Sequence, residues 1–219
     1  MIVDERTITY INSLEQGDSE FLRMIAKEAA ASFVPIIRKE TGSLLKTLVE
    51  MKRPRRILEV GTATGYSALL MSEHMPEGST ITTIEKYEKR IPIARENFRR
   101  GGKEDVITLL PGDAAEILKS LSGPYDFIFM DAAKGQYIHF LPEVLRLMLV
   151  GGVLVSDNVL QDGDLIESRF AVTRRNRTIH ARMREYLYTI KHMEELETAV
   201  IPIGDGVTIS VKIKEQLQR

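Results

Sequence analysis

The stretch from Ile57 to Ser67 restricts the possible folds of this chain more than any other part of it. It begins with mostly apolar residues that fit a buried strand, continues through a turn marked by Gly61 and Gly65, and leads into an apolar helical pattern. A strand, a glycine turn and a helix in this order form the first unit of a parallel α/β sheet. Because glycine has no Cβ, the turn can be tight and can lie close to a ligand at the helix start.

The spacing of these glycines narrows the kind of ligand. A dinucleotide loop has the pattern Gly-x-Gly-x-x-Gly, and a phosphate loop has a lysine after its last glycine. Neither pattern is present, which disfavours a nicotinamide-dependent dehydrogenase, and the acidic Glu59 precedes the turn. A carboxylate there would repel a pyrophosphate and would suit a ligand with a cationic end, such as an amino acid or a sulfonium. A plain strand-to-helix turn without a ligand remains an alternative.

Composition predicts one globular α/β domain over residues 1–219. The chain is 43% hydrophobic and 28% charged, with a formal net charge of −1 that gives no overall indication of nucleic-acid binding. The absence of cysteine excludes disulfides and thiolate metal sites. We expect a cytoplasmic protein without a membrane segment, because there is neither a signal peptide pattern nor an apolar run near the roughly 20 residues that span a bilayer.

Strand and helix patterns alternate after an all-helical beginning. Residues 1–50 are expected to be helical and to act either as a lid or as plain packing against a core of residues 51–219. Strands are expected at 56–60, 80–84, 107–110, 125–130, 153–156, 198–203 and 207–212, with helices at 67–73, 88–100, 115–121, 138–149 and 175–195. The last two strands are joined by Gly204-Asp205-Gly206 as a hairpin. This order predicts a doubly wound seven-stranded sheet with an antiparallel hairpin edge.

Acidic side chains follow four of the expected strands: Glu85, Asp113, Asp131 and Asp157. The carboxyl ends of parallel strands share one edge of a sheet, so the four should lie together there. Any one of them could simply cap the next helix. Four like charges at one edge, however, need a cation or hydrogen-bond donors between them.

Two of these positions suit a nucleoside. Glu85 lies at the tip of the second strand, where a carboxylate can accept hydrogen bonds from both ribose hydroxyls. Asp113 and Ala114, at the tip of the third strand, would lie near the adenine. We therefore expect a ligand that contains adenosine.

The other two positions suit a hard metal ion. Asp131, Asp157 and the side-chain oxygen of Asn158 provide three oxygen ligands of the kind that Mg²⁺ prefers, with Mn²⁺ or Ca²⁺ also possible. Lys134 follows Asp131 closely and is a candidate general base for a hydroxyl, or else an ordinary solvated lysine. Zinc is not expected, because the four histidines are scattered: His74, His139, His180 and His192.

Together these segments resemble the catechol O-methyltransferase-like family. The motifs are Glu59-x-Gly61-Thr62-x3-Gly65-Tyr66-Ser67, Glu85, Gly112-Asp113-Ala114, Asp131-Ala132-Ala133-Lys134 and Asp157-Asn158, and the resemblance runs from roughly Val34 to Val211. It implies a Rossmann-like class I methyltransferase that uses S-adenosylmethionine and a divalent metal and forms a homodimer.

The resemblance also implies residue roles. Asp131, Asp157 and Asn158 would bind Mg²⁺, and Lys134 would be the catalytic base beside Asp131. The cofactor site would be formed by Ile37, Glu59, Gly61, Gly65, Tyr66, Ser67, Glu85, Asp113, Ala114 and Asp131, with the N-terminal helices as a cap over the substrate.

Within the family the chain is most similar to bacterial tRNA 5-hydroxyuridine methyltransferases. The supporting segments are residues 131–137, residues 157–160 and residues 201–206. Small-molecule members more often have aromatic residues where this chain has Ala132 and Ala133. The resemblance therefore implies the wobble uridine in a tRNA anticodon loop as acceptor, with a small catechol or phenol as the alternative.

A local excess of positive charge independently favours RNA. The segment 169–191 has seven arginines and lysines against one acid, Glu185, and its apolar residues mark a single helix face. A basic face is typical of a surface that binds a phosphate backbone. The candidate contacts are Arg174, Arg175, Arg177 and Arg182. Two alternatives remain: a solvated helix whose arginines pair with acids elsewhere, and a non-catalytic nucleoside-binding module on the same fold.

Overall fold

A computed structural model describes residues 3–215 of the chain. The helices are α1 (Glu5–Ser13), α2 (Glu20–Ala31), α3 (Lys39–Lys52), α4 (Tyr66–His74), α5 (Ile91–Arg100), α6 (Ala114–Ser120), α7 (Tyr137–Leu147) and α8 (Arg177–His192), with the short 3-10 helices η1 (Lys134–Gln136), η2 (Gln161–Ile166) and η3 (Arg174–Asn176). The strands are β1 (Arg56–Val60), β2 (Thr80–Glu85), β3 (Ile107–Pro111), β4 (Tyr125–Met130), β5 (Met148–Ser156), β6 (Leu196–Ile201) and β7 (Val207–Lys212).

The strands form one seven-stranded sheet in the order β3-β2-β1-β4-β5-β7-β6. Strands β1 to β5 are parallel to one another, whereas β7 is antiparallel to both β5 and β6. The predicted doubly wound α/β sheet with an antiparallel hairpin edge is thus confirmed. The ends of β1, β2, β4 and β5 come together at one edge of the sheet, because successive parallel strands run in the same direction.

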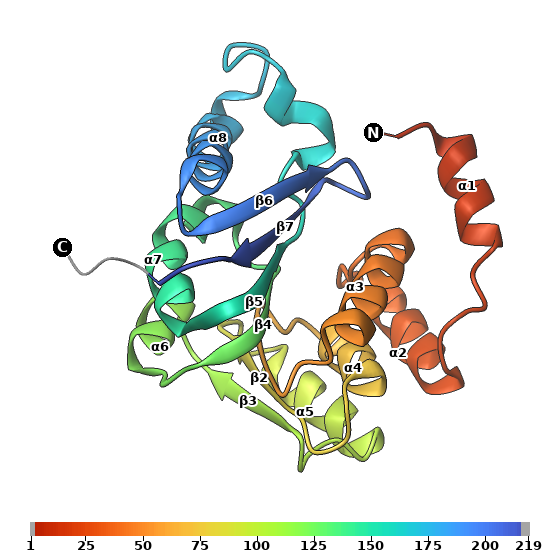
Figure 1. Cartoon of the computed structure of the whole chain (residues 1–219). Coiled ribbons are helices and arrows are strands. Elements are labelled where there is room, and N and C mark those ends of the chain that lie inside the picture. The colour runs from red at the N-terminus through yellow and green to blue at the C-terminus, as the bar shows by residue number, and fades with distance from the viewer. Residues whose placement is uncertain (1–2, 216–219) are drawn as a thin grey trace.

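Helices cover both faces of this sheet (Figure 1). One face packs against α6, α7 and α8 around Ile128, Leu154 and Met183. The other packs against α2, α3, α4 and α5 around Ile57 and Phe127. The parallel strands are therefore buried on both sides, which explains why they are nearly continuous apolar runs in the sequence.

The N-terminal helices differ in how closely they join the core. Ser19 caps α2, because its Oγ accepts a hydrogen bond from the backbone N–H of Leu22 at 3.2 Å. Helix α3 continues through Lys52 and contributes Leu45 and Val49 to the core, so it passes the limit of residue 50 expected for the helical segment. Helix α1 has no buried residue and projects from the body of the molecule (Figure 1).

Two strands begin earlier than the sequence predicts. Strand β6 begins at Leu196 rather than at residue 198, because Leu196 pairs with Lys212 and Ile201 pairs with Val207, which leaves residues 202–206 for the turn. Strand β5 begins at Met148 rather than at residue 153, since Met148 pairs with Tyr125 ahead of a local irregularity. Gly151 and Gly152 lie within this strand, and the ladder continues past them.

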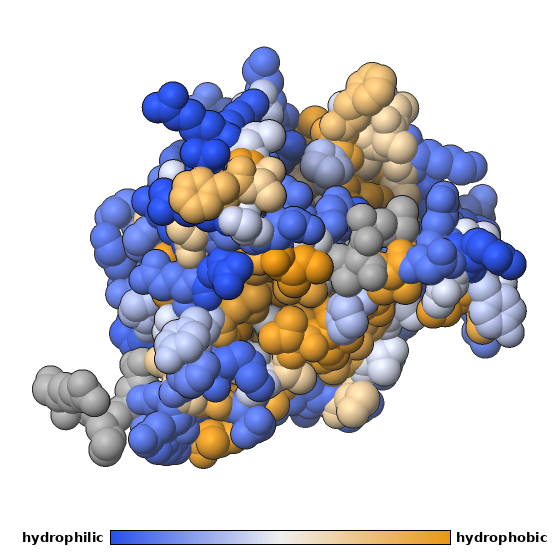
Figure 2. Space-filling model, turned by 90° about the horizontal axis from the view of Figure 1, so that it is seen from above, coloured by the Kyte–Doolittle hydropathy of each residue, from blue (hydrophilic) through white to orange (hydrophobic). Residues whose placement is uncertain are grey.

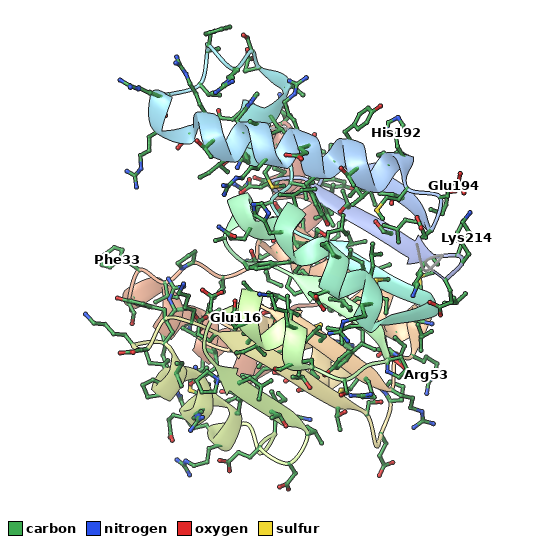
Figure 3. All side chains as sticks on the ribbon, turned by 90° about the vertical axis from the view of Figure 1, so that its left-hand side faces the viewer. Phe33, Arg53, Glu116, His192, Glu194 and Lys214 are labelled. Carbon is green, nitrogen blue, oxygen red and sulfur yellow. The ribbon has the colours of Figure 1, made fainter. Side chains whose placement is uncertain are left out.

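The face seen in Figure 2 is mainly hydrophilic around a central group of hydrophobic side chains. Several large apolar side chains are strongly exposed elsewhere on the surface, among them Phe33, Ile166 and Phe170. Phe33 is 95% exposed at a φ of 54° and points away from the body of the molecule (Figure 3). It lies just before residues 35–38, which form part of the cavity wall described next.

Candidate functional site

A cavity of about 1350 Å³ lies at the carboxyl edge of the parallel strands. The loops after β1, β2, β3, β4 and β5 line it, together with residues 35–38 and Asp205. Its volume exceeds the roughly 300–1,000 Å³ of a typical small-molecule site, so it has room for a cofactor and an acceptor together.

Most of the expected site residues line this cavity: Ile37, Gly61, Glu85, Asp113, Ala114, Asp131, Lys134, Asp157 and Asn158. Four expected cofactor residues do not reach its wall: Glu59, Gly65, Tyr66 and Ser67. The residues at the strand ends therefore share one cavity, whereas part of the segment from β1 to α4 lies outside its wall.

Gly61 allows the ends of β1 and β4 to approach each other. Its φ is 107°, and a Cβ at this position would overlap the backbone carbonyl oxygen of Asp131. Gly65 has a φ of 86° and caps α4, and a Cβ there would come within 2.5 Å of the Phe98 ring. Both glycines are thus required by the backbone itself, as well as by any ligand near the turn.

Glu59 has a different environment from the one expected. Its side chain is fully buried, accepts a hydrogen bond from the Ser67 hydroxyl at 2.5 Å and accepts a second from the Thr83 hydroxyl. Burial raises the pKa of Glu59 to about 8, although both hydroxyls oppose the shift. The expectation that this carboxylate selects a cationic ligand by its charge therefore loses its support, because the group is hidden and its neutral form is favoured.

Tyr66 is also turned away from the cavity. Its hydroxyl donates to Asp18 at 2.6 Å and so ties the start of α4 to the segment before α2. The Ser67 hydroxyl donates its hydrogen bond to the buried Glu59 carboxylate. These two side chains hold the glycine turn in place from behind, and a direct contact of either with a cofactor stays a prediction.

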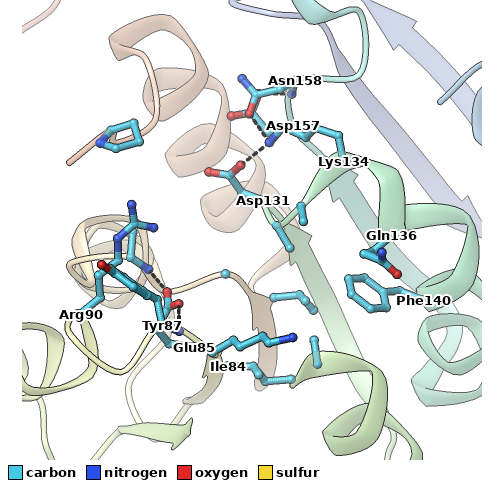
Figure 4. Close-up of a pocket in the computed structure, with 18 of the residues that line it drawn as sticks. Ile84, Glu85, Tyr87, Arg90, Asp131, Lys134, Gln136, Phe140, Asp157 and Asn158 are labelled. Atoms are coloured by element: carbon cyan, nitrogen blue, oxygen red, sulfur yellow. Dashed lines mark hydrogen bonds and ion pairs between the residues drawn. The ribbon is translucent and has the colours of Figure 1, made fainter. Parts of the chain in front are cut away.

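Glu85 lies at the tip of β2, as expected, and organises two loops (Figure 4). One carboxylate oxygen accepts the backbone N–H of Ala63 at 2.7 Å, and the other accepts the backbone N–H of Tyr87 at 2.7 Å. The side chain is nearly buried but lines the cavity. A carboxylate has about four lone-pair sites, so two remain for a ligand.

Asp113 caps a helix and also lies at the cavity, whereas its expected place near the adenine stays a prediction. It caps α6 by accepting the N–H of Ala115 at 2.9 Å, and it lies on the cavity wall. The Lys86 ammonium, 2.6 Å from its other oxygen, holds the pKa of Asp113 below its usual value. Ala114, which follows, adds a small apolar surface to the same wall.

Lys134 lies at the centre of the remaining polar group (Figure 4). Its Nζ is 2.8 Å from Asp131 Oδ1 and 2.6 Å from Asn158 Oδ1. Asp157 is 2% exposed, and burial, followed by the charge of Asp131, raises its pKa to about 7. The Asp131 carboxylate and the Asn158 amide oxygen thus share the Lys134 ammonium, which also favours the charged form of the buried Asp157 carboxylate.

This donor set fits a hard divalent cation. Carboxylate and amide oxygens are the ligands of Mg²⁺, and the cavity beside them leaves room for water or substrate. Across residues 3–215, no three or more His, Cys, Asp and Glu side chains are grouped so as to hold a metal ion, and the candidate set consists of two aspartates and one asparagine. The metal assignment stays a prediction.

The basic segment adjoins this site. Helix α8 packs beside η1, and Arg182 donates from Nη1 to the carbonyl of Gly135 at 3.1 Å. Arg182 is half-buried, so it supports the Lys134 loop rather than presenting a free charge. Arg174 and Arg175 are exposed, while Arg177 is half-buried with its guanidinium 5.8 Å from the centre of the Phe170 ring.

Several wall residues were not predicted from the sequence: Arg38, Gln136, Phe140 and Asp205. Tyr137 was also missed, although it follows the Lys134 loop directly. It is fully buried, and its hydroxyl donates towards the carbonyls of Met130 at 3.0 Å and Asp157 at 3.1 Å, which joins the ends of β4 and β5. Only its place in the Asp131–Tyr137 segment could have indicated it.

Comparison with known proteins gives the family. The model of the family described as O-methyltransferase matches residues 12–213, nearly the whole chain. The chain belongs to the O-methyltransferase family. Like the family, it is an enzyme that uses S-adenosylmethionine for transfer to oxygen. This result confirms the expected enzyme class and removes the nucleoside-binding module and the dehydrogenase from consideration.

Individual proteins similar to this O-methyltransferase are also O-methyltransferases. A catechol O-methyltransferase of Niastella koreensis is 31% identical over 72% of this chain and 74% of its own length. A caffeoyl-CoA O-methyltransferase of Populus kitakamiensis is 29% identical over 91% of this chain and 89% of its own. The crystal structure of an O-methyltransferase from Bacillus cereus in complex with SAH matches with a TM-score of 0.83 at 25% identity, covering 93% of this chain and 96% of that one. Within residues 3–215, no helix of this O-methyltransferase has the length and apolar character to cross a membrane.

Proposed function

We propose that this O-methyltransferase methylates a hydroxyl whose neighbouring oxygen also reaches a divalent cation held by Asp131, Asp157 and Asn158. The observation that carries the proposal is the position of Lys134, whose Nζ lies between Asp131 Oδ1 and Asn158 Oδ1 on the cavity wall. When bound, the cation would lower the pKa of the acceptor hydroxyl and fix the orientation of the acceptor.

The chain's own residues would perform the remaining tasks. Glu85 would bind the ribose of S-adenosylmethionine, and Asp113 with Ala114 would lie at its adenine. Only as a neutral amine, not as the ammonium paired with Asp131, would Lys134 accept the hydroxyl proton at Nζ. The oxygen's electron pair would then form the new bond to the methyl carbon. The carbon–sulfur bond would break with its electrons staying on sulfur, which yields S-adenosylhomocysteine. Positioning the two reactants in line within one cavity supplies much of the rate enhancement.

For the acceptor, we propose 5-hydroxyuridine at the tRNA wobble position, giving 5-methoxyuridine. Its 5-oxygen lies next to the 4-carbonyl, so both oxygens can reach one cation, as the two oxygens of a catechol do. The exposed Arg174 and Arg175, on a segment whose helix adjoins the Lys134 loop, support an RNA acceptor. A wobble base lies in a single-stranded loop and can be turned out into a pocket.

A small catechol or phenol is the second candidate. The names of two relatives, a catechol O-methyltransferase and a caffeoyl-CoA O-methyltransferase, support it. Against it, the wall between Asp131 and Lys134 consists of Ala132 and Ala133, which offer no aromatic surface for stacking on a phenolic ring.

A direct competition between acceptors tests the proposal. Purified protein with labelled S-adenosylmethionine and Mg²⁺ should methylate tRNA that carries 5-hydroxyuridine, and mass spectrometry of the digested tRNA should show 5-methoxyuridine. A deletion strain should lack that nucleoside. Turnover of a catechol with no product on tRNA would replace the RNA acceptor by the small-molecule one, and no transfer to either would refute the vicinal-oxygen requirement.

Two further features implied by the family resemblance stay predictions. We propose that the protein is a homodimer, which light scattering after size-exclusion chromatography would measure directly. We also propose a cytoplasmic location, which fractionation of the source cells would test.

A further inference from the structure

Asn158 holds a position in which its orientation matters. Its backbone has a φ of 56°, a left-handed value that asparagine adopts more readily than most residues other than glycine. The amide oxygen accepts a hydrogen bond from Lys134 Nζ at 2.6 Å, and the amide nitrogen donates to Asp205 Oδ2 at 3.0 Å. The two ends of the side chain thus have different partners.

The partner on the nitrogen side determines which end faces the site. An ionised carboxylate can only accept hydrogen bonds, and the Arg38 guanidinium favours the ionised form of Asp205 against the burial that raises its pKa. Asp205 therefore selects the NH₂ end of the amide and leaves the oxygen for Lys134 and the cation. In the reversed orientation, the NH₂ group would point at the Lys134 ammonium and would offer no lone pair to a metal. The contact with Asp205 therefore decides whether Asn158 can be a ligand.

Asp205 is itself held from several sides. Arg38 Nη2 lies 2.5 Å from Asp205 Oδ1 and 3.0 Å from Asp162 Oδ1, so a guanidinium balances the half-buried carboxylate. The backbone of the turn is hydrogen-bonded to the segment after Asn158, from Leu160 N to Asp205 O at 2.8 Å. The turn and Asn158 are consequently fixed relative to each other.

Close packing adds to this restraint. Gly204 has a φ of 57°, and a Cβ there would come within 2.7 Å of Thr41 Oγ1 in α3. A Cβ at Gly206 would overlap the side chain of Leu160. The β6–β7 turn is therefore wedged between the N-terminal helices and the loop after β5, and it carries Asp205 to the cavity wall.

We propose that Asp205 is a positioning residue that orients the Asn158 amide, so that its oxygen faces the candidate cation and Lys134. The inference rests on the proposed function, because the site it serves is the proposed methyl-transfer centre. Arg38 supports Asp205 by neutralising its charge. Residues that orient metal ligands in this way typically affect metal affinity or activity by about 10- to 100-fold when replaced.

Mn²⁺ binding, measured by electron paramagnetic resonance on the full chain, gives the first test. Asp205→Ala should weaken Mn²⁺ binding by about 10- to 100-fold, while Asp205→Asn, which keeps an acceptor oxygen, should lose less. Asp164→Ala makes the same change at an exposed position of η2 and should bind like wild type. The double variant Asn158→Ala/Asp205→Ala should bind like Asn158→Ala alone, because Asp205 acts only through that side chain.

The side-chain amide signal of Asn158 in an ¹⁵N–¹H spectrum gives a second test that needs no metal. The signal should move in Asp205→Ala and should stay in Asp164→Ala. An unchanged signal in Asp205→Ala would overturn the positioning role. So would a loss of Mn²⁺ affinity in the double variant that equals the sum of the losses in the two single variants. Absence of Mn²⁺ binding by the wild type would instead refute the metal part of the proposed function, and the amide signal would still decide the role of Asp205.

Discussion

Replacement of Glu85 by glutamine tests the cofactor side of the cavity. The carboxylate is 8% exposed and accepts the backbone N–H groups of Ala63 and Tyr87, each at 2.7 Å. Glutamine keeps the size of the side chain but has only one acceptor oxygen, so its NH₂ group would face one of these donors. The substitution should therefore affect both the stability of the loops and the binding of the ribose.

The size of both effects follows from these contacts. A hydrogen bond to a charged group contributes about 1.5–3 kcal/mol, so disturbing two of them costs up to about 6 kcal/mol. Water from the cavity can reach the freed donors, and we expect a loss nearer 3 kcal/mol. For a chain of this size, that corresponds to a fall in Tm of about 6–12 °C. A loss of about 1–3 kcal/mol at the ribose would weaken S-adenosylhomocysteine binding by about 5- to 140-fold.

Calorimetric titration with S-adenosylhomocysteine and thermal unfolding measure the two effects separately. Glu77→Gln, at an exposed position before the opposite end of β2, is the matched control and should change neither value. If Glu85→Gln lowers Tm but binds S-adenosylhomocysteine like wild type, the ribose assignment is wrong. If neither value changes, the two backbone contacts contribute nothing measurable and the reasoning fails at its first step.

Three other predictions concern pH, metal and RNA. Glu59 has a folded-state pKa of about 8 against an ordinary value of 4.5, so between these values the folded chain holds a proton that the unfolded chain releases. Its contribution to stability therefore falls as pH rises, by at most about 1.4 kcal/mol per unit, and urea unfolding from pH 5 to 8 should show a shallower decline in Glu59→Gln. A chelator should abolish methyl transfer yet leave Tm nearly unchanged, and Asp157→Ala should be inactive; full activity in excess chelator would contradict the metal assignment. Replacing Arg174, Arg175 and Arg177 by alanine should weaken tRNA binding and make the slope of log K against log salt shallower by roughly 2 to 3, with catechol turnover unaffected; an unchanged slope would count against the RNA surface.

The sheet could be predicted because its strands differ clearly from the helices between them. Buried parallel strands must be apolar almost throughout. Strands β1 and β4 can therefore be recognised in the sequence as short apolar runs, followed by Gly61 and Asp131 respectively. The grouping of Glu85, Asp131 and Asp157 followed from the same reasoning, because ends of parallel strands meet at one edge. Both predictions depend only on the pattern of apolar residues along the chain and on the shared direction of parallel strands.

Contacts between distant segments could not be predicted in this way. The Arg38–Asp205 ion pair joins residues far apart in the sequence, and nothing local indicates that they meet. Glu59 was misjudged for a similar reason, since its burial depends on the Thr83 hydroxyl from the neighbouring strand. Arg182 was counted as a surface charge, although the helix it belongs to turns its side chain towards the Lys134 loop.

The strand order has a consequence for how the enzyme is assembled. Strand β6 is made before β7, yet β7 lies between it and β5, so β6 can enter the sheet only with β7 as its partner. Strand β6 therefore joins the sheet only through the β6–β7 hairpin. Its turn carries Asp205, and docking creates the contact with Asn158. A molecule whose hairpin is not docked would therefore keep the loop after β1 but lack the contact that orients Asn158.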